Sequence, residues 1–408
     1  MFGLFAKTKH ETAPAIVAEE QRATLAYPDA SLLELFGVIP SAAGVTVSPA
    51  SAIRVPAVSA GVKAISEAAA GLPLHAYRRA ADGSRERDTA HPAARLLNGD
   101  SNPWTRGQQL RETITADAIT YGNGYAQVLR DSAGEPRELH RIHPNGVTIE
   151  VDDLTHEPRY RLSVATGDRV LPFGDVLHIR APSPTSSDLV GVSPLTQAKD
   201  AIGLLIVLQQ HANQLFARGG RPSGVLSFNE KLAADTAARI KASWTAATSG
   251  GNAGGTAVLE QGGRFEPLAF KSTDAQFVEL WALSLTEIAR VLRVPPVLLM
   301  DYSRQTWANA EVGGQQFLTY SLAPWLARWE AEATLKLIPA DDRDTVFVEH
   351  LTDSILRSDF ATRATAYGQY RTMGAMTANE VRAGLNLPPL PGGDTLDNPN
   401  ITPGAADV

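Results

Sequence analysis

The chain has 408 residues, of which 44% are hydrophobic and 20% are charged, and 44 acidic against 37 basic residues give a formal net charge of −7. This length suffices for roughly two or three domains, and the composition excludes a wholly disordered chain. The absence of cysteine excludes a disulfide framework, a thiolate nucleophile, an iron–sulfur cluster and a zinc ribbon. The acidic balance argues against tight DNA binding by the bulk surface, while a passing contact with DNA stays open.

The first half of the chain predicts an α+β arrangement. Residues 1 to about 50 are expected to form an extended arm with weak structure of its own. Apolar residues at helical spacing, Val58, Val62 and Ile65, predict a helix over 58–70. Further helices are expected at 92–97 and 105–120, a hairpin turn at 81–83, and strands at 74–78, 125–130, 138–142, 147–151, 160–164 and 176–180.

The second half is predicted to be mostly helical. Ser193 and Pro194 form a helix start, and Gly219 and Gly220 provide the stop about 25 residues later. A second long helix is expected over 273–293, before a double proline. Between the two helices lies a compact insert with a strand, a short helix over 233–247 and two more strands.

An irregular stretch is expected from Val297 to Asn309, and a loop of this length between long helices is usually functional or disordered. A third long helix then runs to Leu337 with an interruption at Pro324. The strand 346–348, a helix over 354–373 and a capped short helix at about 377–382 complete the chain.

No targeting or anchoring segment is predicted. The longest apolar run within the predicted helices, residues 201–208, is far shorter than the roughly 20 residues needed to cross a bilayer. The apolar residues at the N-terminus precede its charges, the reverse of the order in a signal peptide. We therefore expect the protein to stay where it is made, without a membrane partner.

The common catalytic motifs are missing from the sequence. None of the eight lysines follows a glycine, so a standard Walker A loop is absent, and there is neither a dinucleotide-binding glycine pattern nor a G-x-S-x-G elbow. His140 and His143 lie three apart on a predicted strand, where this spacing directs the two rings to opposite faces. No catalytic, cofactor-binding or metal-ligating residue is predicted.

A carboxylate cluster leaves one enzymatic alternative open. Asp341, Asp342 and Asp344 could hold a divalent ion, as in a metal-dependent hydrolase or nuclease. The interleaved Arg343 and the preceding proline favour a solvated loop instead. Trp281, Trp325 and Trp329 stand at helical spacing with other apolar residues, which favours core or subunit packing over base stacking. A monomeric scaffold protein is a further alternative.

Five segments carry a resemblance when they are taken together and in order: residues 121–126 (YGNGYA), 191–195 (GVSPL), 216–226 (FARGGRPSGVL), 287–299 (EIARVLRVPPVLL) and 377–382 (TANEVR). In this order they resemble the portal protein family of tailed double-stranded-DNA bacteriophages, of the long-tailed type, over about residues 55 to 390. Gly124 stands where a bulkier residue is common, and Gly219-Gly220 replaces a more usual Asn-Gly. The short, alanine-rich and lysine-poor chain suggests a compact member from a prophage or a gene transfer agent.

The resemblance implies a portal-type α+β fold, with an α+β wing, two long stem helices that bracket a small α/β clip insert, and a helical crown. The implied divisions are a flexible arm (1–50), wing (51–190), stem helix (191–220), clip (221–271), stem helix (272–294), tunnel loop (295–310), long wing helix and strand (311–350), crown (351–390) and flexible tail (391–408).

The function implied by the resemblance is that of a structural conduit and not of an enzyme. Such proteins form a ring, usually of twelve copies, at one capsid vertex, and double-stranded DNA passes non-specifically through it during packaging and ejection. The implied partners are other copies of the chain, the terminase large subunit, the major capsid protein and the head–tail adaptor protein. The implied location is the portal vertex of a virion or virus-like particle that assembles in the host cytoplasm.

Candidate DNA-facing residues also follow from the resemblance. The tunnel loop would present Ser303, Arg304, Gln305, Thr306, Trp307 and Asn309 to DNA. Arg304 could make transient phosphate contacts or be a solvated loop cation. Asp274, Glu279 and Glu287 are candidates for lining the channel, because an acidic wall does not hold a polyanion and lets it slide.

Overall fold

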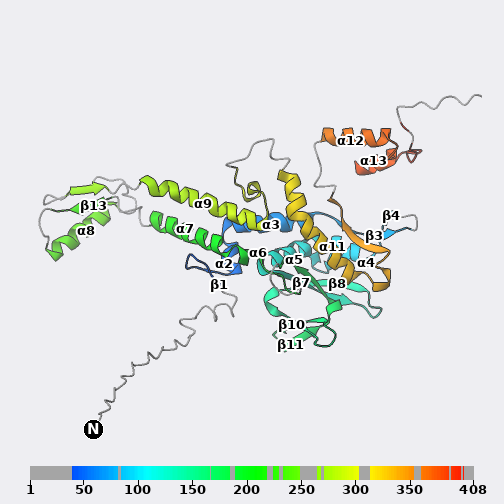
Figure 1. The fold of residues 1–408 in the computed structure, drawn as a ribbon, viewed down its shortest axis with the longest axis horizontal. Coiled ribbons are helices and arrows are strands. Elements are labelled where there is room, and N and C mark those ends of the chain that lie inside the picture. Colours follow the sequence, from blue (N-terminus) through cyan, green and yellow to red (C-terminus); the bar gives the residue numbers. More distant parts are fainter. Residues whose placement is uncertain are drawn as a thin grey trace, which may run out of the picture.

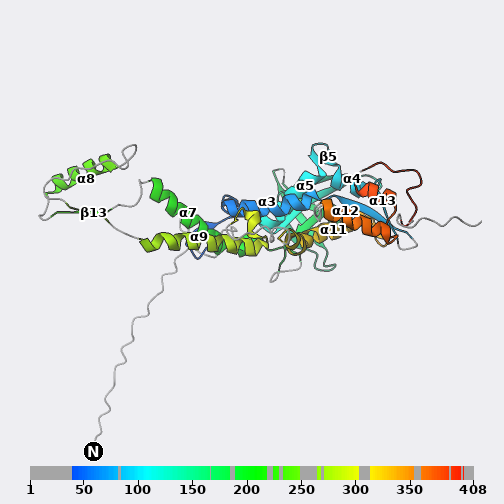
Figure 2. The ribbon, with the colours of Figure 1, turned by 90° about the horizontal axis from the view of Figure 1, so that it is seen from above.

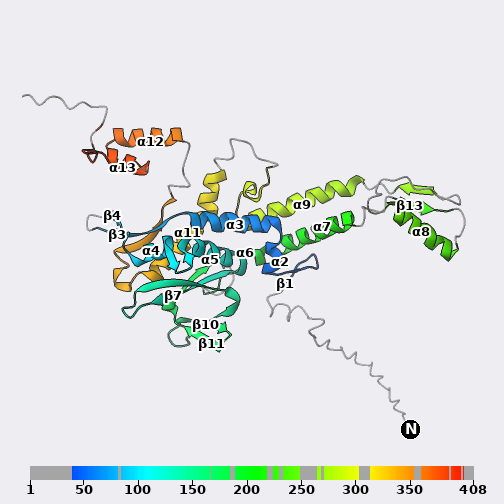
Figure 3. The ribbon, with the colours of Figure 1, turned by 180° about the vertical axis from the view of Figure 1, so that it is seen from behind.

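The computed structural model describes residues 39–80, 84–165, 167–183, 189–217, 224–228, 233–248, 264–267, 271–302, 313–352, 360–385, 387–396 and 398. Figure 1 shows a mixed α/β body from which two helices, α7 (Lys199–Ala217) and α9 (Lys271–Leu292), project side by side. Helix α8 (Ala234–Thr248) lies beyond their far end, and the views in Figures 2 and 3 agree on this elongated shape. Helices α12 (Phe360–Thr372) and α13 (Ala378–Gly384) lie at the opposite end.

The last part of the predicted N-terminal arm is ordered. Strands β1 (Ile39–Pro40) and β2 (Thr46–Val47) form an antiparallel pair, and α2 (Pro49–Ile53) begins directly after it. The backbone N–H of Ala42 donates to Asp200 Oδ1 at 2.9 Å, which joins this hairpin to the start of α7. The expectation of weak structure is therefore wrong for residues 39–50, and residues 1–38 lie outside the described residues.

A three-stranded antiparallel sheet connects the two halves of the chain. Its order is β15 (Val346–His350), β3 (Leu74–Arg79), β4 (Arg85–Arg87), so a late strand lies beside an early one. Helix α3 (Pro56–Gly71) precedes β3 and buries Val58, Val62 and Ile65, as predicted.

The remaining strands of the body form small antiparallel sheets. One has the order β12 (Val176–Arg180), β7 (Asn123–Arg130), β8 (Pro136–Ile142), and another has the order β11 (Gly167–Leu171), β10 (Pro158–Val164), β9 (Val147–Val151). The sequence did not predict β11, nor the short pair β5 (Asp100–Asn102) and β6 (Thr105–Arg106), which follows α4 (Pro92–Asn98). Because β6 takes up residues 105 and 106, helix α5 begins at Gly107 and runs to Tyr121.

The long helices differ from the predictions in detail. The helix predicted from Ser193 is divided into α6 (Pro194–Gln197) and α7, because Ala198 leaves helical geometry with φ −89° and ψ 8°. In the insert, β13 (Gly224–Ser227) and β14 (Arg264–Pro267) pair antiparallel. The other predicted strand of the insert lies outside the described residues.

The helix around Pro324 continues where an interruption was predicted. Residues Phe317–Leu322 form a π-helical segment that leads directly into α11 (Ala323–Leu337). The N–H of Ala323 bonds to the carbonyl of Leu318, five residues back. Proline cannot donate to the carbonyl four residues before it and its ring clashes there, and the wider π turn relieves both effects.

The predicted irregular stretch is regular at its start. Pro296–Leu299 forms a 3-10 helix, η4, which contacts α3 and α9, and Met300 ends it in the left-handed region with φ 63°. The expectation of irregular structure from Val297 is therefore wrong for these residues. Residues 303–312 lie outside the described part of the chain.

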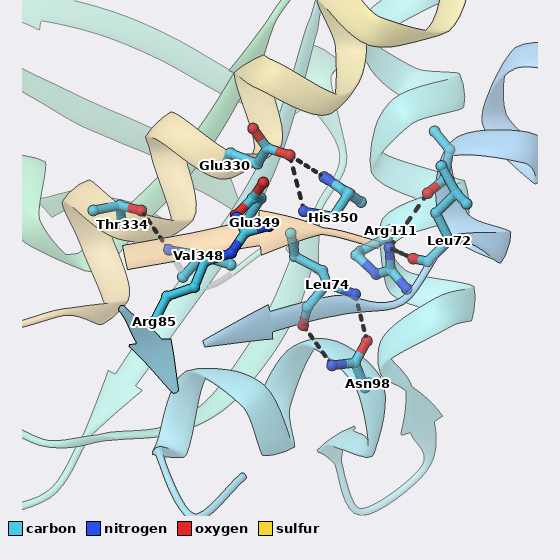
Figure 4. A network of polar contacts seen from close by, with 11 residues as sticks. Leu72, Leu74, Arg85, Asn98, Arg111, Glu330, Thr334, Val348, Glu349 and His350 are labelled. Atoms are coloured by element: carbon cyan, nitrogen blue, oxygen red, sulfur yellow. Dashed lines mark hydrogen bonds and ion pairs between the residues drawn. The ribbon is translucent and has the colours of Figure 1, made fainter. Parts of the chain in front are cut away.

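Arg111 holds three segments of the body together from within the core. Its side chain is 3% exposed and donates to the carbonyls of Ala69, Ala70 and Leu72, at 3.3, 2.9 and 2.8 Å, and of Leu97, at 3.1 Å. Burial lowers the pKa of Arg111 to about 10, so the guanidinium stays charged at neutral pH. Figure 4 shows it between α5 and the end of α3, where it satisfies carbonyls that the helix itself leaves without donors.

Buried histidines predict a loss of stability on acidification. Burial lowers the pKa of His75, His178 and His350, and Arg111 faces the first and last of these. Glu330 Oε1 lies 2.9 Å from both His350 N and Nδ1, which leaves Nε2 without a partner among the described residues (Figure 4). The unfolded chain, with histidine pKa values near 6.5, binds more protons than the folded chain. The stability that these neutral histidines contribute is therefore complete above about pH 6.5 and is lost progressively below it.

We expect the thermal unfolding midpoint to fall as pH decreases from 7.5 to 5.5, and His350→Gln to weaken this dependence. Gln keeps an N–H donor for Glu330 but does not titrate, so the slope should decrease by up to about 1.4 kcal/mol per pH unit. Circular dichroism melts at several pH values measure it. His211→Gln, at an exposed histidine of α7, is the matched control. Equal slopes for His350→Gln and the wild type would contradict the prediction.

Candidate functional site

Two of the family-like motifs meet in space, although about 70 residues separate them. Asn123 Oδ1 accepts from the backbone N–H of Gly191 at 2.9 Å, and Asn123 Nδ2 donates to the carbonyl of Gly191 at 3.3 Å. The Ser193 hydroxyl shares its proton between the carbonyls of Ile119 and Thr120, at 2.9 and 2.8 Å. Ser193 also caps α6 by accepting from Leu195 N at 3.1 Å. We call this region the motif junction: Gly122, Asn123, Gly124, Gly191 and Ser193.

Glycine is required in the motif junction by close backbone packing. Gly122 ends α5 in the left-handed region with φ +87°, and a Cβ there would lie 2.4 Å from the carbonyl oxygen of Gly191. A Cβ on Gly124 would lie 2.3 Å from the carbonyl oxygen of Ile114 in α5. Gly124, which departs from the pattern we associate with the family, therefore lets β7 lie directly against α5.

His178 lies beneath the motif junction and is held in one tautomer. Its Nε2 donates to Asn123 Oδ1 at 2.9 Å, and Nδ1 accepts from the hydroxyl of Tyr160 at 3.2 Å. Glu332 Oε1 accepts from His178 N at 2.9 Å, and burial raises the pKa of Glu332. Burial, followed by the charges of Arg180 and Lys336, lowers the pKa of His178 well below its usual value. The histidine is neutral, its two ring nitrogens join β12 to β7 and β10, and its backbone N–H joins β12 to α11.

The helix pair α7 and α9 shares an apolar interface near the body. Ile202 and Leu205 of α7 and Ile288 of α9 are buried there. Farther out, His211 packs on Phe277 with ring centroids 6.3 Å apart, and Phe277 packs on Trp281 at 6.2 Å.

The opposite side of α9 carries exposed apolar residues on two flanks. Val278 is 66% exposed, Leu280 is 42% exposed and Leu283 is 53% exposed. Successive helical residues differ by about 100° around the axis, so Val278 and Leu280 lie on either side of Glu279. Thr286 and Arg290 share the outward face with Glu279 and are also exposed. A polar face thus runs along α9 between two apolar flanks.

The predicted channel residues differ in their exposure. Glu279 is exposed on the polar face of α9, whereas Glu287 is half-buried and forms an ion pair with Arg290. Asp274 lies on α9, but its side chain is outside the described residues. The predicted tunnel-loop residues Ser303, Arg304, Gln305, Thr306, Trp307 and Asn309 are also outside them.

The carboxylates of the enzymatic alternative lie on an exposed turn. Asp341 and Asp342 belong to the 3-10 helix η6 (Ala340–Asp342). Arg343 turns back to donate to the carbonyls of Ile338 and Leu335, at 3.1 and 2.7 Å. Over the part of the chain that the structure describes, no three His, Asp or Glu side chains are grouped so as to hold a metal ion.

The other residues weighed in the sequence have separate contacts. His140 Nε2 lies 2.7 Å from Glu138, whereas His143 accepts from Asn145 N at 3.3 Å. Trp329 is 1% exposed and donates from Nε1 to Thr115 Oγ1 at 2.9 Å, which joins α11 to α5. Trp325 is also buried, so core packing is confirmed for Trp325 and Trp329, whereas Trp281 is half-buried against the core. No described helix is long and apolar enough to cross a bilayer.

Sequence reasoning singled out the segment that contains Asn123 but not the contacts of its side chain, and it did not single out His178 or the flanks of α9. Their roles depend on contacts between distant segments or on exposure in the folded chain, which periodicity does not report. One signal was present for the flanks: Val278, Leu280 and Leu283 lie outside the buried stripe of α9, so the helix has more apolar residues than one buried face requires.

The phage portal protein family matches residues 56–386, a range that contains the motif junction and both projecting helices. This chain belongs to the phage portal protein family. It is 30% identical to the portal protein of Enterobacteria phage HK97, over 82% of this chain and 78% of that protein. It is 31% identical to the probable portal protein of Streptomyces phage phiC31, over 93% of this chain and 84% of that protein. The predicted family is confirmed.

Two solved structures share the fold of this family member. A chain from the virion of a native gene transfer agent particle matches with a TM-score of 0.60 and 24% identity, over 84% of this chain and 94% of that chain. An HK97 family phage portal protein from Corynebacterium diphtheriae matches with a TM-score of 0.56 and 16% identity, over 79% and 98%. The predicted portal-type α+β fold is therefore confirmed.

Proposed function

We propose that this protein forms a ring of twelve copies at one vertex of a capsid, and that double-stranded DNA passes through the ring during packaging and ejection. Membership of the portal family supports a structural role without catalysis. The observation that carries the proposal is the arrangement of α9, where two exposed apolar flanks border a polar face that contains Glu279.

This arrangement suits a ring of side-by-side helix pairs. In a closed ring each copy uses two different surfaces, and one flank of α9 would contact the neighbour on that side. The flank with Val278 and the flank with Leu280 and Leu283 would be covered, and the polar face would be left toward the central space. A carboxylate such as Glu279 repels phosphate and so does not retain DNA there.

We assign the elements of the structure to the stem, clip, wing and crown that the resemblance implies. The helices α7 and α9 form the stem, and α8 with β13 and β14 belongs to the clip, which would meet the terminase large subunit and later the head–tail adaptor protein. The body forms the wing and would contact the major capsid protein, and α12 and α13 form the crown. Asp274, Glu279 and Glu287 stay candidates for lining the stem channel, and of these Glu279 lies on the exposed polar face.

Particle size and shape test the proposal directly. Light scattering and negative-stain microscopy of the purified protein should show rings with a central hole and a mass near twelve times 43.5 kDa. A monomer that hydrolyses DNA with a divalent metal would overturn the proposal and favour the hydrolase or nuclease alternative at Asp341, Asp342 and Asp344.

A deletion within the proposed tunnel loop tests ring assembly separately from DNA packaging. Deleting residues 304–308 should leave rings intact, because the proposed ring contacts lie on α9, while DNA packaging or retention falls. Ring formation is checked by microscopy and packaging by nuclease-protected DNA. Exchange of residues 304–308 for glycine and serine at equal length controls for the shortened loop. Loss of rings after the deletion would show that the loop is misplaced in this proposal.

A further inference from the structure

One face of the sheet β15-β3-β4 carries a continuous stack of arginines and aromatic rings. The guanidinium carbon of Arg79 lies 4.9 Å from the ring centroid of Phe347. Phe347 stacks on Tyr77 with centroids 5.7 Å apart and an interplanar angle of 22°. The guanidinium carbon of Arg85 lies 5.5 Å from the ring centroid of Tyr77. The order is thus cation, ring, ring, cation.

The register of the sheet places one more arginine on this face. Tyr77 lies opposite Phe347 on one side and opposite Arg87 on the other, and Arg79 lies opposite Arg85. Directly opposed residues point to the same face of a sheet, so all five side chains share one face. We call it the arginine–aromatic face: Tyr77, Arg79, Arg85, Arg87 and Phe347.

The arginine–aromatic face is accessible and firmly supported. Strand β3 is buried at its start and exposed at its end, so the two rings are half-buried while Arg79, Arg85 and Arg87 are exposed. A guanidinium held over a ring keeps its N–H donors for a second partner. The face therefore offers fixed donors at little cost in side-chain entropy.

The face carries excess positive charge in an acidic chain. Arg85 forms an ion pair with Glu349, which Figure 4 shows on β15. Among the described residues, no carboxylate lies within ion-pair distance of Arg79 or Arg87. Like charges directly opposite each other, as at Arg79 and Arg85, destabilise a sheet. A bound anion would relieve this repulsion.

We propose that the arginine–aromatic face binds the phosphate backbone of nucleic acid. Arginine forms paired hydrogen bonds with phosphate oxygens, and several such contacts along a strand give a salt-dependent affinity without base specificity. This surface lies on the sheet β15-β3-β4 and contains no residue of α9 and none of the candidate tunnel-loop residues. The inference rests on the proposed function only in taking DNA as the polyanion that the protein meets.

The test measures binding of the full-length protein to a 30-base-pair duplex by fluorescence anisotropy across a range of NaCl concentrations. Removing two phosphate contacts with Arg79→Gln and Arg87→Gln should lower the slope of log affinity against log salt by about 2 and the affinity by roughly tenfold at 0.1 M salt. The control, Arg137→Gln with Arg159→Gln, removes the same charge from exposed arginines already paired with Asp131 and Asp152. It should leave both quantities close to wild type.

A double variant of the two aromatic residues identifies whether single-stranded or double-stranded nucleic acid is preferred. Tyr77→Leu with Phe347→Leu keeps the arginines, so a loss confined to a 12-nucleotide oligothymidine would mean that single strands stack on the rings. An equal, small loss for duplex and oligothymidine would mean that the backbone alone is bound. Both results support the proposal.

Three results would overturn it: wild-type protein that does not bind either probe, unchanged binding by the arginine variant, or an equal loss in its control. Polyglutamate binding without DNA binding would likewise assign the face to an acidic protein segment. A protein that stays monomeric would contradict the proposed ring, yet the same titration on the monomer still decides this inference.

Discussion

Replacing Arg111 with methionine should destabilise the α/β body more than any exposed substitution. Methionine retains much of the buried volume but leaves the carbonyls of Ala69, Ala70, Leu72 and Leu97 without their donor. Each unsatisfied buried acceptor costs about 1 kcal/mol or more, so we expect a loss of about 4 kcal/mol. The thermal unfolding midpoint, followed by circular dichroism, should fall by roughly 10 °C.

Two further variants make this result specific. Arg111→Lys retains the charge and one group of donors but loses the planar fork that reaches separate carbonyls. Its unfolding midpoint should therefore lie between those of the wild type and of Arg111→Met. Arg106→Met removes an exposed arginine that pairs with Asp100 and should change the midpoint by about 1 °C at most. A midpoint for Arg111→Met close to wild type would mean that these carbonyls find other donors.

A single carboxylate on a flank of α9 should dissolve the proposed ring. Every interface of a cyclic ring contains one copy of each flank, so Val278→Asp would place a charge in all of them at once. The variant loses an apolar contact and must bury a carboxylate without a partner, which costs several kcal/mol per interface. Light scattering at the concentration where wild type forms rings should then give the mass of the monomer, 43.5 kDa.

The matched control places the same carboxylate on the polar face. Thr286 is exposed on α9 between the two flanks, so Thr286→Asp should form rings as the wild type does. A circular dichroism spectrum like that of wild type would establish that Val278→Asp is folded. Rings formed by Val278→Asp, or monomers formed by Thr286→Asp, would contradict the assignment of the flanks.

Local patterns in the sequence predicted most helices and strands of the body. The alternation at 147–151 and the helical spacing at 105–120 depend on neighbouring residues, and both elements are present. Strand β11 was missed because Gly167 and the charged residues after it lack a strand pattern, and pairing with β10 decides its conformation. The π segment before Pro324 was missed because buried residues of this segment and of α11, on either side of the proline, keep the helix continuous.

The candidate site was predicted in part. The order of the five motifs along the chain was enough to indicate the family. It could not show that residues 121–126 and 191–195 contact each other. Arg111 follows the core residue Leu110 in α5 and would be taken for a solvated polar residue. Its partners are carbonyls up to 42 residues away, which no local pattern reports. The tunnel-loop residues stay predictions.

The pairing of β3 with β15 has a consequence for synthesis of the chain. About 270 residues separate the two strands, so at roughly 5 to 20 residues per second β3 leaves the ribosome on the order of ten to fifty seconds before its partner exists. During that interval one edge of β3 is unpaired. The sheet becomes complete only when β15, which lies within the last fifth of the polypeptide, has emerged, so a chain with β15 still inside the ribosome lacks the finished sheet. This delay favours assembly between finished subunits over association of nascent ones on one messenger RNA.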